Sequence, residues 1–166
     1  MPLLDLAETT VRFLARTRGI RARFLPTRWG RVYVYQADPP NPTELRGDAP
    51  CPIVVVHGIG SNATAFMGLL LQLLDAGHPI VAPDLPGHGR SPAASRALDV
   101  DSAYLALQAV LDELLEQPAL VFGNSLGGAT AGWMATLDPR LRVAVVSGWA
   151  FGSIVETWGK FCTRIP

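Results

Sequence analysis

The 166-residue sequence has no long hydrophobic run and few cysteines. No stretch approaches the roughly 18 apolar residues that a membrane-spanning helix needs, and the first residues lack the cation and the apolar segment of a signal peptide. The two cysteines, Cys51 and Cys162, have no metal-ligand spacing and are too few to cross-link a secreted domain of this size. We therefore expect a cytoplasmic protein that holds no metal and does not insert stably into a membrane.

The sequence also lacks an excess of charge of either sign. Lys plus Arg and Asp plus Glu both number 14, so the overall basic character that nucleic-acid binding requires is missing. Apolar residues make up 49% of the chain, which excludes disorder as the main state. The one local asymmetry is an arginine-rich segment, residues 12–31, which we interpret as a solvated helix face followed by a basic hairpin. A membrane-surface or partner-docking helix is the alternative.

Apolar periodicity predicts one domain with an N-terminal helix and hairpin ahead of a parallel β/α core. Residues 3–14 repeat with a helical period and Gly19 follows as a cap, and residues 20–37 predict an antiparallel hairpin. Residues 1–50 would hold these elements and a loop, and residues 51–150 the core. Short apolar strands alternate there with helices, which is typical of a three-layer α/β/α fold with a mostly parallel sheet. The expected strands are Ile53–Val56, Pro79–Ala82, Ala119–Phe122 and Leu141–Ser147, and the expected helices are Asn62–Ala76, Asp101–Gln117 and Leu126–Leu137.

The strongest chemical signal is a G-x-S-x-G sequence between a predicted strand and a predicted helix. In this segment Ser125 lies between Gly123 and Gly127, and a sharp strand-to-helix turn would project its hydroxyl clear of the backbone. The helix that begins at Leu126 points free N–H groups and the positive end of its dipole toward this place. The pattern predicts a nucleophilic serine. A glycine-rich turn that only packs the helix is the alternative, and it does not explain an exposed serine between the glycines.

Two further loops follow predicted strands. His57-Gly58-Ile59 begins a glycine-containing loop whose backbone N–H groups are placed to complete an oxyanion hole, because open α/β sheets collect ligand sites at the carboxyl ends of their strands. The second loop, residues 84–91, reads DLPGHGRS. Taken alone it indicates only a tight turn, since Asp, Pro and Gly are ordinary turn residues.

Together these three segments resemble the α/β-hydrolase family, whose members carry an HG-type oxyanion loop, a DxPGxGxS loop and a G-x-S-x-G elbow in this order. The resemblance covers residues 31–151. It implies that Ser125 is the nucleophile and that the backbone amides of Ile59 and Leu126 form the oxyanion hole. It also implies supporting roles for four residues that shape the loops around the serine: His57, Gly58, Gly123 and Gly127.

Members similar to this chain are single-domain esterases and related ester, lactone or perhydrolase-type enzymes that need no cofactor. The resemblance thus implies a small acyl or ester substrate, and it implies that His88 orients its own turn. Four apolar residues are candidates for an acyl pocket, although core packing is the simpler interpretation of each: Phe66, Trp133, Trp149 and Phe151.

The sequence lacks the later members of the family's catalytic triad. There the serine is followed by an acid and then a histidine, whereas the 41 residues after Ser125 contain no histidine, and their only acids are Asp138 and Glu156. We interpret these acids as a helix terminus and a helix-surface residue. The sequence therefore predicts a C-terminally truncated hydrolase, in which residues 151–166 start a cap and the strand over residues 141–147 is an open edge.

Two hypotheses about the function remain, one for an enzyme and one for a protein without catalytic activity. The first is a serine hydrolase that cleaves carboxylic ester-type bonds through an acyl-enzyme on Ser125, with its base supplied by further sequence. The printed chain alone would be nearly inactive, because loss of the base costs about six orders of magnitude in kcat. The second is an inactive fragment or a binding domain that retains the fold. Donation of the histidine by another chain is a third option, and the substrate's identity and the oligomeric state stay open.

Overall fold

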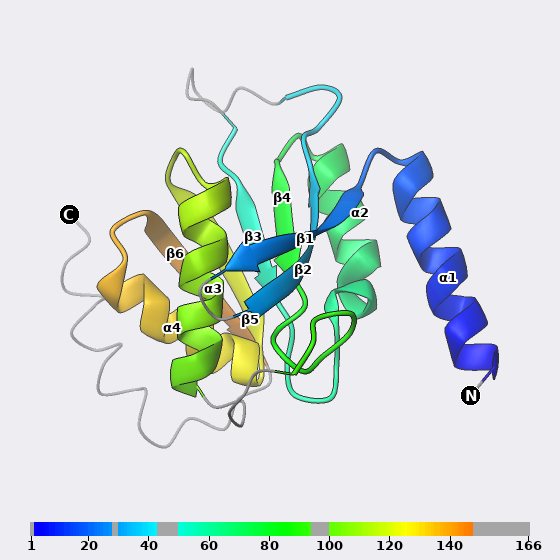
Figure 1. Cartoon of the computed structure of the whole chain (residues 1–166). Coiled ribbons are helices and arrows are strands. Elements are labelled where there is room, and N and C mark those ends of the chain that lie inside the picture. The colour runs from blue at the N-terminus through cyan, green and yellow to red at the C-terminus, as the bar shows by residue number, and fades with distance from the viewer. Residues whose placement is uncertain (1, 28–29, 43–49, 94–99, 148–166) are drawn as a thin grey trace.

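A computed structural model describes residues 2–27, 30–42, 50–93 and 100–147. These residues form one six-stranded sheet with helices on both faces (Figure 1). The strand order is β1-β2-β4-β3-β5-β6. The strands β4, β3, β5 and β6 are parallel, and the hairpin β1–β2 joins them antiparallel through β2. The bounds are β1 Arg21–Thr27, β2 Gly30–Ala37, β3 Ile53–Val56, β4 Ile80–Pro83, β5 Ala119–Asn124 and β6 Leu141–Ser147.

The helices divide the core into two layers, one on each face of the sheet. One layer lies under α3 and α4 and includes Leu107, Val110 and Met134, while the other lies under α1 and α2 and includes Leu70 and Leu74. The expected three-layer α/β/α fold with a mostly parallel sheet is confirmed. The helical bounds are α1 Pro2–Thr17, the 3-10 helix η1 Ala63–Phe66, α2 Met67–Asp75, α3 Val100–Leu114 and α4 Leu126–Leu137.

Buried strands explain why the apolar runs predicted this sheet so closely. All four residues of β3 and of β4 are buried, because helices cover both faces of these central strands. Several helices and strands begin or end a few residues away from their predicted boundaries. The predicted helix Asn62–Ala76 begins as η1, where the Asn62 side chain accepts a hydrogen bond from the Thr64 N–H. The helix predicted to reach Gln117 ends at Leu114, three residues before the position that Pro118 restricts.

The N-terminal helix ends at Thr17 and Gly19 follows with φ +85°, as expected for a cap. Its apolar face differs from the prediction at Leu14, which is 54% exposed. The buried contact is made instead by Ala15, one position further on. Arg12 takes part in this orientation, because its Nε donates a hydrogen bond of 3.2 Å to the hydroxyl of Tyr35 on β2.

None of the described helices is long and apolar enough to cross a membrane. Within the described residues β6 is the outer strand of the sheet, in agreement with the expected edge. The predicted cap segment, residues 151–166, lies outside the described residues.

The turn between α4 and β6 is closed by a buried carboxylate. Asp138 accepts hydrogen bonds from Arg140 Nε at 3.0 and 3.1 Å and from Arg140 Nη2 at 2.6 Å. The same guanidinium donates to Asp112 on α3 at 2.7 Å. The pair therefore ties the end of α4 to the start of β6 and to the neighbouring helix.

Replacing Asp138 with Asn should lower the free energy of unfolding by about 1–3 kcal/mol at pH 7. Hydrogen bonds from Arg140 hold the pKa of the Asp138 carboxyl below its usual value of 3.8, so the carboxylate's contribution is complete above that value. The contribution disappears as the pH falls through the lower folded-state pKa. Urea denaturation at pH 7 and at pH 2.5 should give a difference between the two proteins that shrinks at acid pH, and a difference independent of pH would contradict this account.

Candidate active site

Ser125 occupies the turn between β5 and α4 in a backbone conformation that side chains rarely adopt. Its φ is +52° and its ψ is −118°, and among the described residues it is the only non-glycine with positive φ. Such torsions cost of order 1–3 kcal/mol and persist only where the surroundings impose them. The side chain is partly exposed, so the hydroxyl is held at the carboxyl end of the sheet within reach of solvent.

Glycines impose this conformation by allowing backbones to touch. A Cβ at Gly123 would lie 2.2 Å from the carbonyl oxygen of Gly127, and a Cβ at Gly127 would lie 2.3 Å from the carbonyl oxygen of Val56 on β3. The elbow is thus clamped between α4 and the neighbouring strand. A Cβ at Gly58 would lie 2.9 Å from the Cβ of Ser125, so the loop after β3 lies directly against the serine.

The start of α4 supplies unpaired donors beside the serine. The first hydrogen bond of the helix runs from the Ala129 N–H to the Ser125 carbonyl at 3.0 Å. Leu126, the first helical residue, therefore has an N–H without a partner one turn back in the helix. The positive end of the helix dipole lies at the same place, and together they favour a negative charge beside the serine.

His57 is fully buried and uses both ring nitrogens inside the loops. Its Nε2 accepts a hydrogen bond of 2.8 Å from the Leu85 N–H, so the ring proton is on Nδ1, which donates to the Gly58 carbonyl at 2.7 Å. Burial lowers the pKa of His57 and keeps the ring neutral. Neither nitrogen is left to take a proton from Ser125.

The loop over residues 84–91 is more than the simple turn that its sequence indicates. The buried carboxylate of Asp84 accepts hydrogen bonds from the Ala63 N–H at 2.8 Å and the Arg90 N–H at 2.9 Å. The Ser91 hydroxyl donates to the Asp84 carbonyl at 2.6 Å and accepts from the Tyr33 N–H at 2.8 Å. Asp84 and Ser91 therefore join this loop to η1 and β2. The sequence signal for them was an acid placed directly after a wholly apolar strand.

His88 contacts the backbone of its own turn. Its Nδ1 lies 3.2 Å from the carbonyl oxygen of Pro86 within the same turn, and its ring centroid is 5.4 Å from that of His57. The loops after β3 and β4 thus meet through two histidine rings and the Leu85 hydrogen bond.

A family model described as "Alpha/beta hydrolase family" matches residues 53–161, a range that includes the serine elbow and both neighbouring loops. The chain belongs to the α/β-hydrolase family. Its sequence is 37% identical over 97 residues to the lipase LipV of Mycobacterium tuberculosis, an alignment that covers 58% of this chain and 36% of the lipase. It is 38% identical over 92 residues to a pimeloyl-[acyl-carrier protein] methyl ester esterase of Neisseria meningitidis, covering 55% of this chain and 28% of the esterase.

Solved structures show the same relationship. The N-acyl homoserine lactonase AidH superposes with a TM-score of 0.66 at 29% identity, covering 78% of this chain and 45% of that protein. An epoxide hydrolase from an endophytic Streptomyces superposes with a TM-score of 0.64 at 27% identity, covering 78% of this chain and 37% of that protein. The chain spans about a third of the length of the curated relatives it matches.

Within the described part of the chain, no hydrogen bond joins Ser125 to a histidine. The Nδ1 of His78 lies 3.1 Å from the Cys51 carbonyl, next to the amino end of β3, and Asp138 is paired with Arg140 at the amino end of β6. Both residues lie at the amino-terminal ends of the parallel strands. Ser125 follows the carboxyl end of β5, so it lies at the opposite ends of these strands. Glu156 lies outside the described residues.

The candidate acyl-pocket residues fall in different places. Phe66 packs against the core and meets Phe122 edge-on with ring centroids 5.8 Å apart. Trp133 on α4 is 52% exposed, and Trp149 and Phe151 lie outside the described residues. Ile59 is 69% exposed, so its apolar side chain stands in solvent at the end of the loop that touches the serine.

Gly127→Ala should prevent stable folding, because the new methyl group would meet backbone atoms of β3 that cannot move independently of the sheet. We expect a loss of at least about 3 kcal/mol in unfolding free energy, measured by chemical denaturation. Gly68→Ala is the matched control, since nothing lies within 4 Å of its added Cβ. Gly68 is the second residue of α2, where replacing glycine with alanine should be neutral or should stabilise the helix by less than about 1 kcal/mol. Equal effects of the two substitutions would show that the elbow is not clamped.

Proposed function

We propose that this chain carries the nucleophile and oxyanion half of a serine hydrolase that cleaves carboxylic ester-type bonds. The observation that supports this most is Ser125, held with φ +52° at the strand–helix junction beside the unpaired N–H of Leu126. A merely structural turn gains nothing from a non-glycine residue at these torsions, whereas a nucleophile gains exposure and a fixed direction. Proteins similar in sequence to this chain include a lipase and a methyl ester esterase.

In the proposed reaction the Ser125 hydroxyl oxygen attacks the ester carbonyl carbon and gives its proton to a base. The carbonyl oxygen becomes an oxyanion, which the N–H groups of Leu126 and Ile59 stabilise. Collapse of this intermediate breaks the carbon–oxygen bond to the alcohol, which leaves with a proton, and an acyl-enzyme remains. Water then attacks the acyl-enzyme, releases the carboxylic acid and restores the serine.

The hydrogen bonds of the Gly58 carbonyl fix the direction in which the Ile59 N–H points. The Gly58 carbonyl and the Ile59 N–H belong to one trans peptide unit and point in opposite directions. The carbonyl faces the Nδ1–H of His57 at 2.7 Å and the Ser61 N–H at 3.3 Å, so the N–H faces away from the imidazole. His57 is therefore a positioning residue for the oxyanion hole, and Leu85 sets its tautomer.

The general base and its acid are assigned to parts of the protein outside these 166 residues, in keeping with the greater length of the relatives. The molecule would be cytoplasmic, with a small acyl compound as its partner and no cofactor in the reaction. The division into an N-terminal unit of residues 1–50, a core of 51–150 and a cap from 151 belongs to the same proposal.

The second candidate is a binding domain that keeps the fold without catalysis. It is favoured by one observation, the absence of a hydrogen bond between Ser125 and any histidine of the described residues. The two candidates differ in the reactivity of Ser125. Only the hydrolase has a base elsewhere in the protein that activates the serine.

A fluorophosphonate probe should label the full-length protein at Ser125, because the activated oxygen attacks phosphorus as it would a carbonyl. Ser125→Ala should abolish the labelling and ester hydrolysis, and Ser61→Ala should retain both as a matched loss of a nearby hydroxyl. Mass spectrometry of the labelled peptide identifies the site. Labelling that survives in Ser125→Ala, or no labelling of the wild type, would favour the binding domain.

Substitutions of His57 test the oxyanion geometry. His57→Asn retains a donor near the Nδ1 position for the Gly58 carbonyl, whereas His57→Gln retains only an acceptor near Nε2 for the Leu85 N–H. Both lose one buried hydrogen bond, so we expect similar losses of about 1–3 kcal/mol in stability. The labelling rate should fall about 10²–10³-fold in the Gln variant and much less in the Asn variant. Equal labelling rates at equal stability would remove His57 from the positioning of Ile59.

A further inference from the structure

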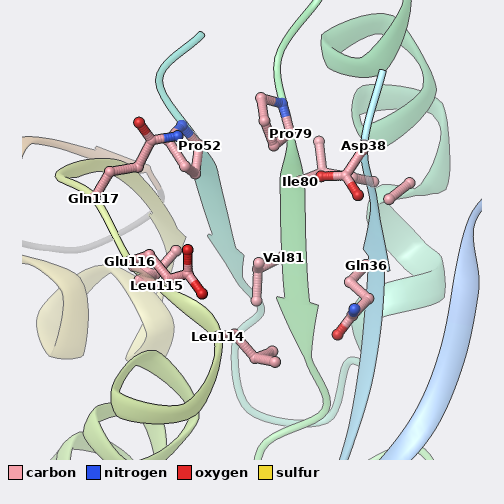
Figure 2. Close-up of a pocket in the computed structure, with 11 residues that line it drawn as sticks. Gln36, Asp38, Pro52, Pro79, Ile80, Val81, Leu114, Leu115, Glu116 and Gln117 are labelled. Atoms are coloured by element: carbon pink, nitrogen blue, oxygen red, sulfur yellow. The ribbon is translucent and has the colours of Figure 1, made fainter. Parts of the chain in front are cut away.

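An arginine-lined hollow of about 360 Å³ lies between α1 and the hairpin β1–β2. The charged residues among its described lining are all basic: Arg12, Arg16 and Arg21. It differs in this respect from a hollow of about 490 Å³ at the amino-terminal ends of β3 and β4, where Asp38 and Gln36 stand on one wall and Glu116 on the other (Figure 2). The arginine-lined hollow therefore attracts anions, and none of the proposed catalytic groups lines it.

Only one side of α1 contacts the rest of the described protein. Four residues make these contacts, and they are spaced three or four positions apart: Glu8, Val11, Arg12 and Ala15. Such residues share one side of a helix. Glu8 Oε1 accepts a hydrogen bond of 3.1 Å from Asn62 Nδ2, and Arg12 Nε donates to the Tyr35 hydroxyl at 3.2 Å. These contacts fix which side of α1 faces solvent.

The outward side of α1 carries large apolar side chains. Phe13 is 66% exposed and Leu14 is 54% exposed, because successive helical residues are about 100° apart and the contacting side lies on either side of them in the sequence. The apolar period of residues 3–14 therefore does not serve only to bury the helix on the sheet. An amphipathic helix with arginine beside phenylalanine and leucine is typical of helices that lie in the interface of a membrane.

The charge around this helix is strongly positive. Residues 8–31 contain seven arginines and a single acid, Glu8, and Glu8 is paired with Arg12. Arg18 is paired with Asp75 of α2 at 2.5 Å. No ion pair of the described residues includes Arg16 or Arg21, which line the hollow. A partner for this surface therefore carries negative charge.

The apolar and the basic parts of this surface are neighbours. Phe13 and Arg16 are three residues apart on α1, which places their Cβ atoms about 5–6 Å from each other. Arg16 in turn lines the hollow with Arg21. A phospholipid in a bilayer presents the same pair of chemistries side by side, since its phosphate group lies directly above its acyl chains. A free anion would use only the hollow and would leave Phe13 and Leu14 in water.

We propose that α1 and the arginine-lined hollow dock this protein on an anionic phospholipid surface. Phe13 and Leu14 enter the upper acyl region, while Arg16 and Arg21 pair with lipid phosphate groups. The docking is peripheral and reversible. It goes beyond the proposed hydrolase function and does not depend on it, because Ser125 and its neighbouring loops take no part.

Cosedimentation of the full-length protein with lipid vesicles tests the docking. Vesicles of equal parts phosphatidylcholine and phosphatidylglycerol should bind it at least about tenfold more tightly than vesicles of phosphatidylcholine alone. Added salt should weaken this binding, because it screens exposed charges. Equal binding to both kinds of vesicle, or no binding to either, would overturn the proposal. Fluorophosphonate labelling of the same samples reports on Ser125 separately, so the two proposals can fail independently.

Substitutions separate the apolar and the charged contributions. Phe13→Ser and Leu14→Ser should each weaken binding to the anionic vesicles about tenfold, and Arg16→Gln and Arg21→Gln about fivefold each. Leu137→Ser is the matched apolar control, since Leu137 on α4 is also 54% exposed. It should bind like the wild type, as should Arg142→Gln, which removes an exposed arginine of β6. Melting temperatures without lipid report whether each variant folds.

Other occupants of the surface give different results. Glycerol 3-phosphate has the charge of a lipid headgroup without acyl chains, so it should not displace the protein from vesicles at millimolar concentration, and displacement would assign the hollow to a free anion. Binding to soluble polyglutamate that matches vesicle binding and survives Phe13→Ser would indicate an acidic protein instead. A dimer that Leu14→Ser dissociates would make this face an interface between copies of the chain. Each of these three results would overturn the proposal.

Discussion

Backbone contact between β3, β5 and α4 is the constraint on which the candidate site depends. Gly123 and Gly127 leave no room for a Cβ against the neighbouring backbones, so the chain must turn sharply between them. That turn forces Ser125 to φ +52° and aims the start of α4 at the same place. The strained, partly exposed serine and the helix dipole beside it are therefore consequences of one packing requirement rather than independent features.

Two buried polar side chains extend this constraint to the surrounding loops. His57 links the loop after β3 to the loop after β4 through Leu85, and Asp84 links that second loop to η1 through Ala63. Both groups are satisfied by backbone partners: N–H groups donate to Asp84, and His57 accepts from one N–H and donates to one carbonyl. This suits buried polar groups in a low-dielectric interior. Neutral His57 and fully bonded Asp84 act as fixed supports. The opposite end of the strands differs, because there the buried Gln36 Oε1 has no donor among the described residues.

Local patterns predicted most of the fold, and the errors have local causes. The wholly apolar run Ile53–Val56 and the helix Leu126–Leu137 match the structure residue for residue. The bounds moved where side chains compete with regular structure, as when Asn62 caps a 3-10 turn. The face of α1 was placed one residue off at Leu14, because helix orientation depends on contacts such as that of Arg12 with Tyr35 rather than on apolar spacing.

The sequence by itself determined the alternation of strands and helices and the presence of a serine elbow, because glycine spacing and apolar period act over a few neighbouring residues. Only the tertiary structure decided that Asp84 is a buried support, that His57 carries its proton on Nδ1, and that Gln36 faces a hollow with carboxylates on two walls. The first two of these depend on partners 20 or more residues away, Ala63 for Asp84 and Leu85 for His57. Such partners meet only when the sheet places distant strands side by side, so that the loops at their ends come into contact.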